Sequence, residues 1–278
     1  MRVLLLFSLF VTSIFGFSFT ITNSTIANGK TSLIKFKKDK DTFLESIKID
    51  KKEYKITDNY VYIPVSYYQK PKSLKVVIFY KEKSKQKQKT VFFKVVDGGY
   101  AKEEIHVAKG KVSLNDKDKK RAAKEYKEAM KIYNTFTPKN YVNSKYIMPL
   151  NSKITSDFGK ARVYNDTLKG YHSGTDFRAK VGTPIKATND GVVVLAKDRF
   201  YSGGSIIIDH GYGVYSCYYH MSKFDVKKGD KVKKGQIIGL SGVSGRVTGP
   251  HLHFSFRVYG VQVDPLQFIE LVNKEVIK

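Results

Sequence analysis

Two histidine signatures lie far apart in the chain and carry the residue types that hold a catalytic metal ion. The first is His172-Ser-Gly-Thr-Asp176 and the second is His251-Leu-His253. Zinc at hydrolytic sites usually takes three protein ligands and leaves a fourth position for water. His172, Asp176 and His253 would make such a set, with His251 and His220 close by to handle protons. The two signatures therefore predict a metal-dependent hydrolytic site.

The second signature lies in a segment with the alternation of a β-strand. Alternate residues of a strand share a face, so one face of residues 251–258 would carry both histidines. The opposite face would carry four apolar side chains: Leu252, Phe254, Phe256 and Val258. Residues 214–220 are also aromatic and β-prone, and the same alternation predicts that Tyr218 and His220 share a face.

The first signature needs a bent backbone to form a site. Residues four apart in a straight strand lie roughly 13 Å from one another, too far for His172 and Asp176 to bind one ion. A helix would bring them together, but Ser173, Gly174 and Thr175 are poor helix formers. A bend near Gly174 is therefore the predicted solution.

With these residues in place, the chain resembles a known family, the LytM/lysostaphin-type zinc peptidases of class M23, which cut peptide bonds in bacterial peptidoglycan. The resemblance runs from about residue 146 to residue 268. Beyond the two signatures it includes several segments in the family's order: Ser156-Asp-Phe-Gly159, Gly182-Thr-Pro184, Ile208-Asp-His-Gly-Tyr-Gly213, Tyr219-His-Met221 and Val263-Asp-Pro265. One signature alone would be a weak indication, whereas both within this run of glycine turns are specific.

The resemblance implies a role for each motif residue and an antiparallel β catalytic domain. His172, Asp176 and His253 match the family's zinc ligands, which implies one Zn²⁺ per chain. His220 and His251 match the two catalytic histidines, which activate water and stabilise the oxyanion of the tetrahedral intermediate. All five positions agree with the family pattern, so the resemblance implies an active enzyme.

Two further residues are candidates for substrate binding. Arg162 matches a segment of the substrate groove, although many relatives have two adjacent arginines where this chain has Ala161-Arg162. Tyr218 could donate a hydrogen bond to an oxyanion, with a buried sheet tyrosine as the alternative. Residues 158–165 resemble members that cut D-alanyl–diaminopimelate cross-links, and Arg162 could hold the free carboxylates of such a stem by bidentate hydrogen bonds.

The implied function is an exported zinc-dependent peptidoglycan D,D-endopeptidase, with accompanying carboxypeptidase activity left open. A non-enzymatic murein-hydrolase activator or cell-wall-binding protein is the alternative. Residues 225–239 also resemble the turns of lipoyl or biotinyl carrier domains, but no lysine for modification is evident in Asn189-Asp-Gly191. Metal content would separate these functions, because neither alternative requires zinc.

The remainder of the chain predicts a mainly β protein with two domains and a connecting helix. Strand-like segments separated by Asn-Gly and Gly-Gly turns favour a small N-terminal β-sandwich, with an immunoglobulin-like topology as the working guess. These segments are residues 17–21, 32–36, 60–64, 74–80 and 90–96. Residues 115–135 have apolar positions at helical spacing, and Asn115 or Asp116 can cap the helix.

The predicted organisation places the catalytic domain last. Its boundaries are 1–18 for a signal peptide, 19–108 for the β-domain, 109–145 for a helical linker and 146–278 for the M23-type peptidase domain. Met1-Arg2, an apolar run over 3–15 and small residues after it indicate secretion. The run is short for a membrane span, with an uncleaved anchor as the alternative, and no later segment is long and apolar enough to cross a membrane. The mature chain should therefore be periplasmic or otherwise exported without a transmembrane span.

The formal net charge of +25 limits the partners of the protein. Lysines gather in residues 35–40 and 81–89, which fits either a solvated face or attraction to an anionic envelope surface. Nucleic acid is disfavoured as a partner, because the chain carries an export signal and no nucleic-acid-binding motif. Peptidoglycan is the predicted partner.

Overall fold

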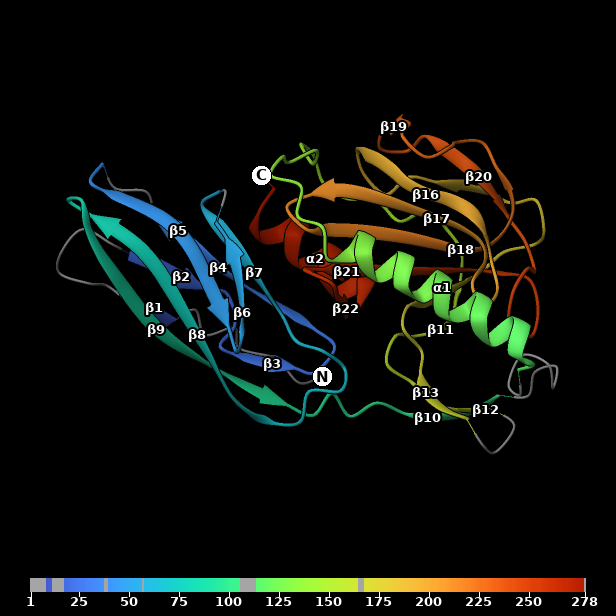
Figure 1. Ribbon diagram of the computed structural model, residues 1–278, viewed down its shortest axis with the longest axis horizontal. Coiled ribbons are helices and arrows are strands. Elements are labelled where there is room, and N and C mark those ends of the chain that lie inside the picture. Colours follow the sequence, from blue (N-terminus) through green and yellow to red (C-terminus); the bar gives the residue numbers. More distant parts are fainter. Residues whose placement is uncertain are drawn as a thin grey trace. The chain divides into compact units, whose positions relative to one another are not determined.

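The computed structural model describes residues 9–11, 18–37, 40–56, 58–105, 114–164 and 168–277 (Figure 1). Most of the predicted signal peptide lies outside these residues. The chain divides into two compact units, Met1–Gly98 and Gly99–Lys278. This division falls earlier in the chain than the predicted end of the β-domain, and the predicted helical linker groups with the second unit.

The first unit consists of two β-sheets. Its strands are β1 (Leu9–Val11), β2 (Ser18–Ile21), β3 (Thr25–Ala27), β4 (Thr31–Lys37), β5 (Thr42–Ile49), β6 (Lys52–Lys55), β7 (Tyr60–Pro64), β8 (Lys72–Glu82) and β9 (Lys85–Val96). One sheet has the order β1-β2-β4-β7 and the other has the order β3-β9-β8-β5-β6. Two sheets are what the sandwich prediction requires, and the immunoglobulin-like topology stays a prediction.

All five predicted strands of this unit are present, as β2, β4, β7, β8 and β9. Along β8, Leu74, Val76 and Ile78 are buried while Lys75 between them is exposed, which is the pattern of a strand with one face on a core. The strands β3, β5 and β6 were not predicted, nor was β1, which lies within the predicted signal peptide and pairs with β2. β6 has the sequence Lys-Glu-Tyr-Lys, which carries little of the apolar alternation that indicates a strand. It lies at the edge of its sheet and is a strand because it pairs with β5.

The second unit is built on a ten-stranded sheet. Its strands are β10 (Lys102–Ile105), β11 (Ile154–Ser156), β12 (Ala161–Tyr164), β13 (Leu168–Tyr171), β14 (Thr175–Arg178), β15 (Pro184–Lys186), β16 (Gly191–Arg199), β17 (Gly203–Gly211), β18 (Val214–Phe224), β19 (Lys231–Val232), β20 (Ile237–Ser241), β21 (His251–Val258) and β22 (Val261–Val263). The main order is β11-β14-β21-β18-β17-β16-β19, with β15, β20 and β22 attached, and β10-β12-β13 form a separate small sheet. The strands of the large sheet pair antiparallel, which confirms the predicted architecture, whereas β10 joins β12 in parallel.

Two helices lie on this unit (Figure 1). The predicted helix is α1 (Asp116–Tyr133), and the side chain of Asn115 caps it by accepting a hydrogen bond from the Asp118 amide at 2.8 Å. Its buried residues Ala129 and Tyr133 pack against β16, β17 and β18. The helix is therefore part of the packing of the large sheet.

The second helix, α2 (Pro265–Glu275), was not predicted, although Asp264 caps it and Pro265 begins it. Phe268 of α2 packs on Phe256 of β21, with 5.0 Å between the ring centroids. The apolar face of β21 is thus buried, as its alternation predicts, and its polar face is left for the site.

Candidate active site

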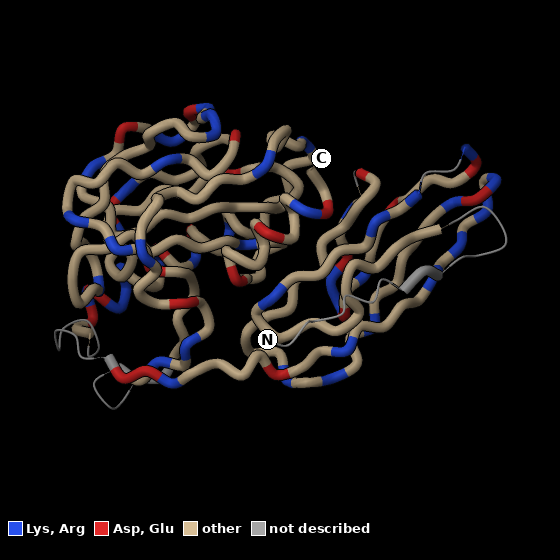
Figure 2. The backbone as a smooth tube through the Cα atoms, turned by 180° about the vertical axis from the view of Figure 1, so that it is seen from behind, with Lys and Arg blue, Asp and Glu red and all other residues tan. Residues whose placement is uncertain are grey.

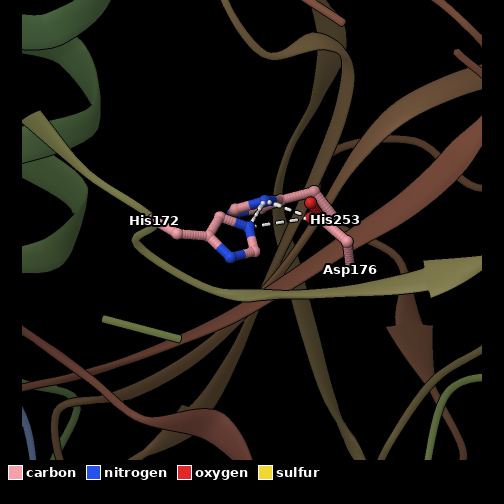
Figure 3. Close-up of side chains that lie close together, drawn as sticks. All are labelled: His172, Asp176 and His253. Carbon is pink, nitrogen blue, oxygen red and sulfur yellow. Dashed lines mark hydrogen bonds and ion pairs between the residues drawn. The ribbon is translucent and has the colours of Figure 1, made fainter. Parts of the chain in front are cut away.

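The two histidine signatures meet where β14 pairs with β21. In this antiparallel ladder Asp176 lies directly opposite His253. Oδ1 of Asp176 is 2.9 Å from Nδ1 of His253 and 2.9 Å from Nε2 of His172, and the two ring nitrogens are 3.1 Å apart (Figure 3). Three side chains from distant parts of the sequence therefore converge on one point.

A bend at Gly174 brings His172 and Asp176 together, as predicted. A Cβ atom on Gly174 would lie 2.4 Å from the carbonyl oxygen of Phe254 and 2.5 Å from Nε2 of His253. Contacts this short do not occur for real Cβ atoms, so the bend can pass over β21 only because this residue lacks a side chain. The glycine also bounds one edge of the His253 ring.

The donor atoms of this group suit a single cation. Nδ1 of His172 donates to the carbonyl oxygen of Asp157 at 2.7 Å, which leaves the lone pair of Nε2 directed at Asp176. All three side chains are buried, with 1% of His172, 6% of Asp176 and 8% of His253 exposed. Ligand atoms around tetrahedral zinc lie about 3.3 Å apart, close to the spacing found between these atoms. His172, Asp176 and His253 therefore form a group that could hold a metal ion.

The ionisation states of the group agree with this role. Burial raises the pKa of the Asp176 carboxyl, but the adjoining imidazoles of His172 and His253 outweigh burial and leave this pKa below its usual range. Burial lowers the pKa of His253 to about 4, although Asp176 opposes the shift. Near neutral pH the group thus combines a carboxylate with a neutral imidazole at His253, and a bound cation would balance the negative charge of Asp176.

The other two histidines of the motifs lie beside this group. The His220 and His251 rings are 4.8 Å apart, and Nε2 of His251 is 3.6 Å from Oδ1 of Asp176. Nδ1 of His220 donates to the carbonyl of Ser244 and Nδ1 of His251 donates to that of Gly249, both at 2.8 Å. A carbonyl oxygen can only accept, so Nε2 of each ring is the acceptor nitrogen. Burial, reinforced by the His253 and His251 rings, lowers the pKa of His220 to about 3.

His220 reaches the site through an irregularity in β18. The pairing with β17 shifts between Tyr218 and Met221, and His220 has a positive φ of 63°. Such a bulge re-aims the side chain that follows it. The prediction that Tyr218 and His220 share a face was therefore wrong, because the alternation of a regular strand does not hold across the bulge.

Tyr218 lies in the core and its side chain is fully buried. Its hydroxyl accepts hydrogen bonds from the amide of Thr188 at 2.9 Å and from the hydroxyl of Ser216 at 3.1 Å. This corresponds to the buried sheet tyrosine given as the alternative, and the placement does not fit the predicted contact with substrate. The neighbouring Tyr219 lies closer to the group instead, stacked on the His253 ring.

His172, Asp176 and His253 are called the metal group below. A groove of about 390 Å³ opens beside this group. Its walls include Asp176, His251 and Arg162, so the predicted groove residue Arg162 does line it. Nε of Arg162 donates to Glu103 at 3.0 Å, and one terminal nitrogen lies 3.2 Å from Ser156 Oγ and 3.5 Å from Asp176 Oδ2. The guanidinium thus joins the groove wall to the metal group.

Glu103 and Glu104 of β10 also line the groove, and sequence reasoning missed both. β10 reaches the groove by pairing with β12, which places Glu103 beside Arg162 in the register. A charged segment such as Lys102-Glu-Glu-Ile has no apolar alternation, so no sequence signal could have identified it as a strand.

The second unit matches the description "Peptidase family M23" over residues 170–265. The chain belongs to this family. A crystal structure assigned to peptidase M23 from Pseudomonas aeruginosa is 25% identical, with a TM-score of 0.68, and the match covers 88% of this chain and 95% of that one. The likeness to that structure therefore extends into both units of this chain.

Two curated relatives match less than half of this chain. The peptidoglycan DD-endopeptidase ShyA of Vibrio cholerae is 45% identical over 122 residues, which is 43% of this chain and 28% of ShyA. The glycyl-glycine endopeptidase ALE-1 of Staphylococcus capitis is 47% identical over 108 residues, which is 36% of this chain and 30% of ALE-1. The chain thus spans less than a third of the length of either relative. The two names describe different bonds, so membership of the M23 family does not by itself determine the substrate.

Proposed function

We propose that the protein is a zinc-dependent peptidoglycan hydrolase that cuts D-alanyl–diaminopimelate cross-links. The observation that carries this proposal is the meeting of His172, Asp176 and His253 beside a groove that Asp176 lines, with two further imidazoles next to them. In this proposal the first three residues hold one Zn²⁺ per chain. The other two, His220 and His251, are the catalytic histidines.

When bound, zinc would supply Lewis-acid chemistry by activating water and polarising the scissile carbonyl. The acceptor nitrogens of His220 and His251 can take a proton from attacking water and return it to the leaving amine. Because their Nδ1 atoms are held by backbone carbonyls, both rings keep a fixed tautomer and direction. Their protonated forms would also stabilise the developing oxyanion.

The proposed substrate is supported by the ShyA name and by Arg162, the arginine in the groove wall. The diaminopimelate stem carries free carboxylates, whereas a glycine bridge offers no side-chain charge. Arg162 presents a guanidinium at the groove, and a bidentate pair with a substrate carboxylate is the strong geometry for that group. Carboxypeptidase activity on the same stems is compatible with this groove, which is open at the surface.

A peptidoglycan substrate implies that the protein acts outside the cytoplasm, in the periplasm or cell envelope. Among the described residues no helix is long and apolar enough to cross a membrane. Lysine and arginine are spread along both units (Figure 2), and the net charge is +25. Such a charge would hold the protein near anionic envelope polymers by long-range attraction.

The test is digestion of purified cross-linked muropeptides by the full chain, with products identified by mass spectrometry and metal content measured on the same sample. We expect dimers to become monomers, with one zinc per chain and loss of activity in a chelator. Release of glycine from a pentaglycine substrate, with diaminopimelate dimers intact, would reverse the substrate assignment. A metal-free protein that digests neither would support the activator function instead.

A further inference from the structure

Helix α1 reaches the metal group through a pair of tyrosines. Tyr133, the last residue of α1, is 3% exposed, and its hydroxyl lies 2.9 Å from the hydroxyl of Tyr219 on β18. The Tyr219 ring stacks on the His253 ring, with 5.5 Å between centroids and 17° between the planes. The contacts therefore run from the end of the helix to one of the three converging side chains.

The Tyr219 ring limits how the His253 imidazole can rotate, and so fixes where its two nitrogens point. His253 is bounded at one edge by Gly174 and across one face by Tyr219. With the ring confined in this way, Nδ1 points at Asp176 and His172. Rotation of the imidazole would need the Tyr219 ring to move first. The position of Tyr219 thus controls the direction of the lone pair.

Three side chains besides Tyr219 contact Tyr133. The Arg257 guanidinium lies 4.4 Å from the centroid of its ring, and the Tyr215 ring packs against it edge-on with 5.9 Å between the centroids. Its hydroxyl also contacts Sγ of Cys217 at 3.6 Å. Removing either tyrosine hydroxyl would deprive the other of this 2.9 Å hydrogen bond, and a buried hydroxyl that loses such a bond costs free energy.

We propose that Tyr219 is a positioning residue for His253, and that Tyr133 anchors it from α1. The helix is thus part of the functional metal site, although it supplies no ligand. This inference rests on the proposed function, in that it takes His253 to be a ligand. Residues that hold a metal-binding histidine in orientation typically alter metal affinity by about 10–100-fold when they are changed.

The experiment compares the zinc affinity of four full-length proteins by competition with a chromogenic chelator. They are the natural chain, Tyr133→Phe, Tyr219→Phe and the double variant. Each single change removes the hydrogen bond between the two hydroxyls and keeps both rings, so each should weaken zinc binding by about five-fold or more. The double variant should bind zinc about as tightly as either single variant. All three lose the same hydrogen bond, so the two effects are not additive.

Tyr215→Phe is the matched control. Its hydroxyl donates to the carbonyl of Thr135, just beyond the end of α1, at 2.8 Å, so this variant also loses a bond to the helix end. Tyr215 makes no stacked contact with His253 in the described structure, and its zinc affinity should stay within two-fold of the natural chain. Visible spectra of the Co²⁺-loaded proteins should change for Tyr219→Phe and stay constant for the control.

The outcomes separate the inference from the function on which it rests. Natural chain that fails to bind zinc would overturn the proposed function and the positioning role with it. If the natural chain binds zinc and Tyr133→Phe and Tyr219→Phe bind it with the same affinity, the positioning role alone is overturned. Equal weakening by Tyr215→Phe would also overturn it, because general loosening of the helix would then explain the effect.

Discussion

Replacing Gly174 with alanine tests how closely the backbone bend is fitted to the metal group. The new methyl carbon would lie 2.4 Å from the Phe254 carbonyl oxygen and 2.5 Å from Nε2 of His253, while ordinary contact begins at 3.4 Å. Each atom must therefore retreat by about 1 Å. Phe254 lies in a central strand paired on both sides, so the imidazole and the bend must absorb most of the shift.

The structure allows the magnitude to be estimated. Overpacking of this kind costs about 1–3 kcal/mol of folding free energy. A ligand ring displaced by a substantial fraction of an ångström should lose about 10–100-fold in zinc affinity, or about 1.4–2.8 kcal/mol. The free energy of unfolding should be measured in urea, and zinc affinity by chelator competition at neutral pH.

Gly249→Ala is the control for this prediction. A Cβ atom on Gly249 would meet nothing within 4 Å, although the residue lies on the wall of the same groove. Its zinc affinity and stability should match those of the natural chain. If Gly174→Ala also binds zinc within two-fold of the natural chain, the close fit between the bend and His253 does not constrain the site.

Three further predictions concern the site and the core. His172→Ala, Asp176→Ala and His253→Ala should lose zinc, whereas His220→Ala and His251→Ala should retain nearly one zinc per chain and lose most turnover; full activity of either of the last two would refute their catalytic role. Glu103→Gln should lower KM for cross-linked muropeptides by up to about five-fold, because a partly exposed ion pair with Arg162 competes by at most about 1 kcal/mol; a raised KM would mean that Glu103 orients the arginine instead. Burial lowers the folded-state pKa of His210 to about 4 from 6.5, so the unfolded chain binds the proton first and the free energy of unfolding should fall by up to about 3 kcal/mol from pH 6.5 to pH 4. His210→Gln should show a shallower fall in urea titrations, and an unchanged slope would contradict the assignment.

The sequence predicts best where one local rule operates. The alternation of residues 251–258 predicts the polar and apolar faces of β21, because a strand repeats every two residues. Helical spacing and an asparagine cap predict α1 to within two residues of each end. The bend at Gly174 follows from the distance that His172 must cover to reach Asp176.

The sequence fails where pairing between distant segments decides the structure. β10 is a strand because β12 lies beside it, and its own charged residues carry no signal. The bulge that turns His220 toward the site is a mismatch between β17 and β18, which neither strand shows alone. The contact of Tyr133 with Tyr219 likewise depends on where α1 packs on the sheet. The sequence therefore does not indicate that Tyr219, and not Tyr218, lies beside the metal group.

The pairing of β14 with β21 also affects the order of events during folding. His253 lies 77 residues beyond Asp176, and a shift of one residue in their ladder would turn one of the two side chains to the wrong face. An unfolded or misregistered chain therefore has no three-residue site, and tight metal capture must follow correct strand pairing. Bound metal would then hold that pairing in place, so metal uptake would act as a checkpoint that gives hydrolytic capacity only to completely folded chains.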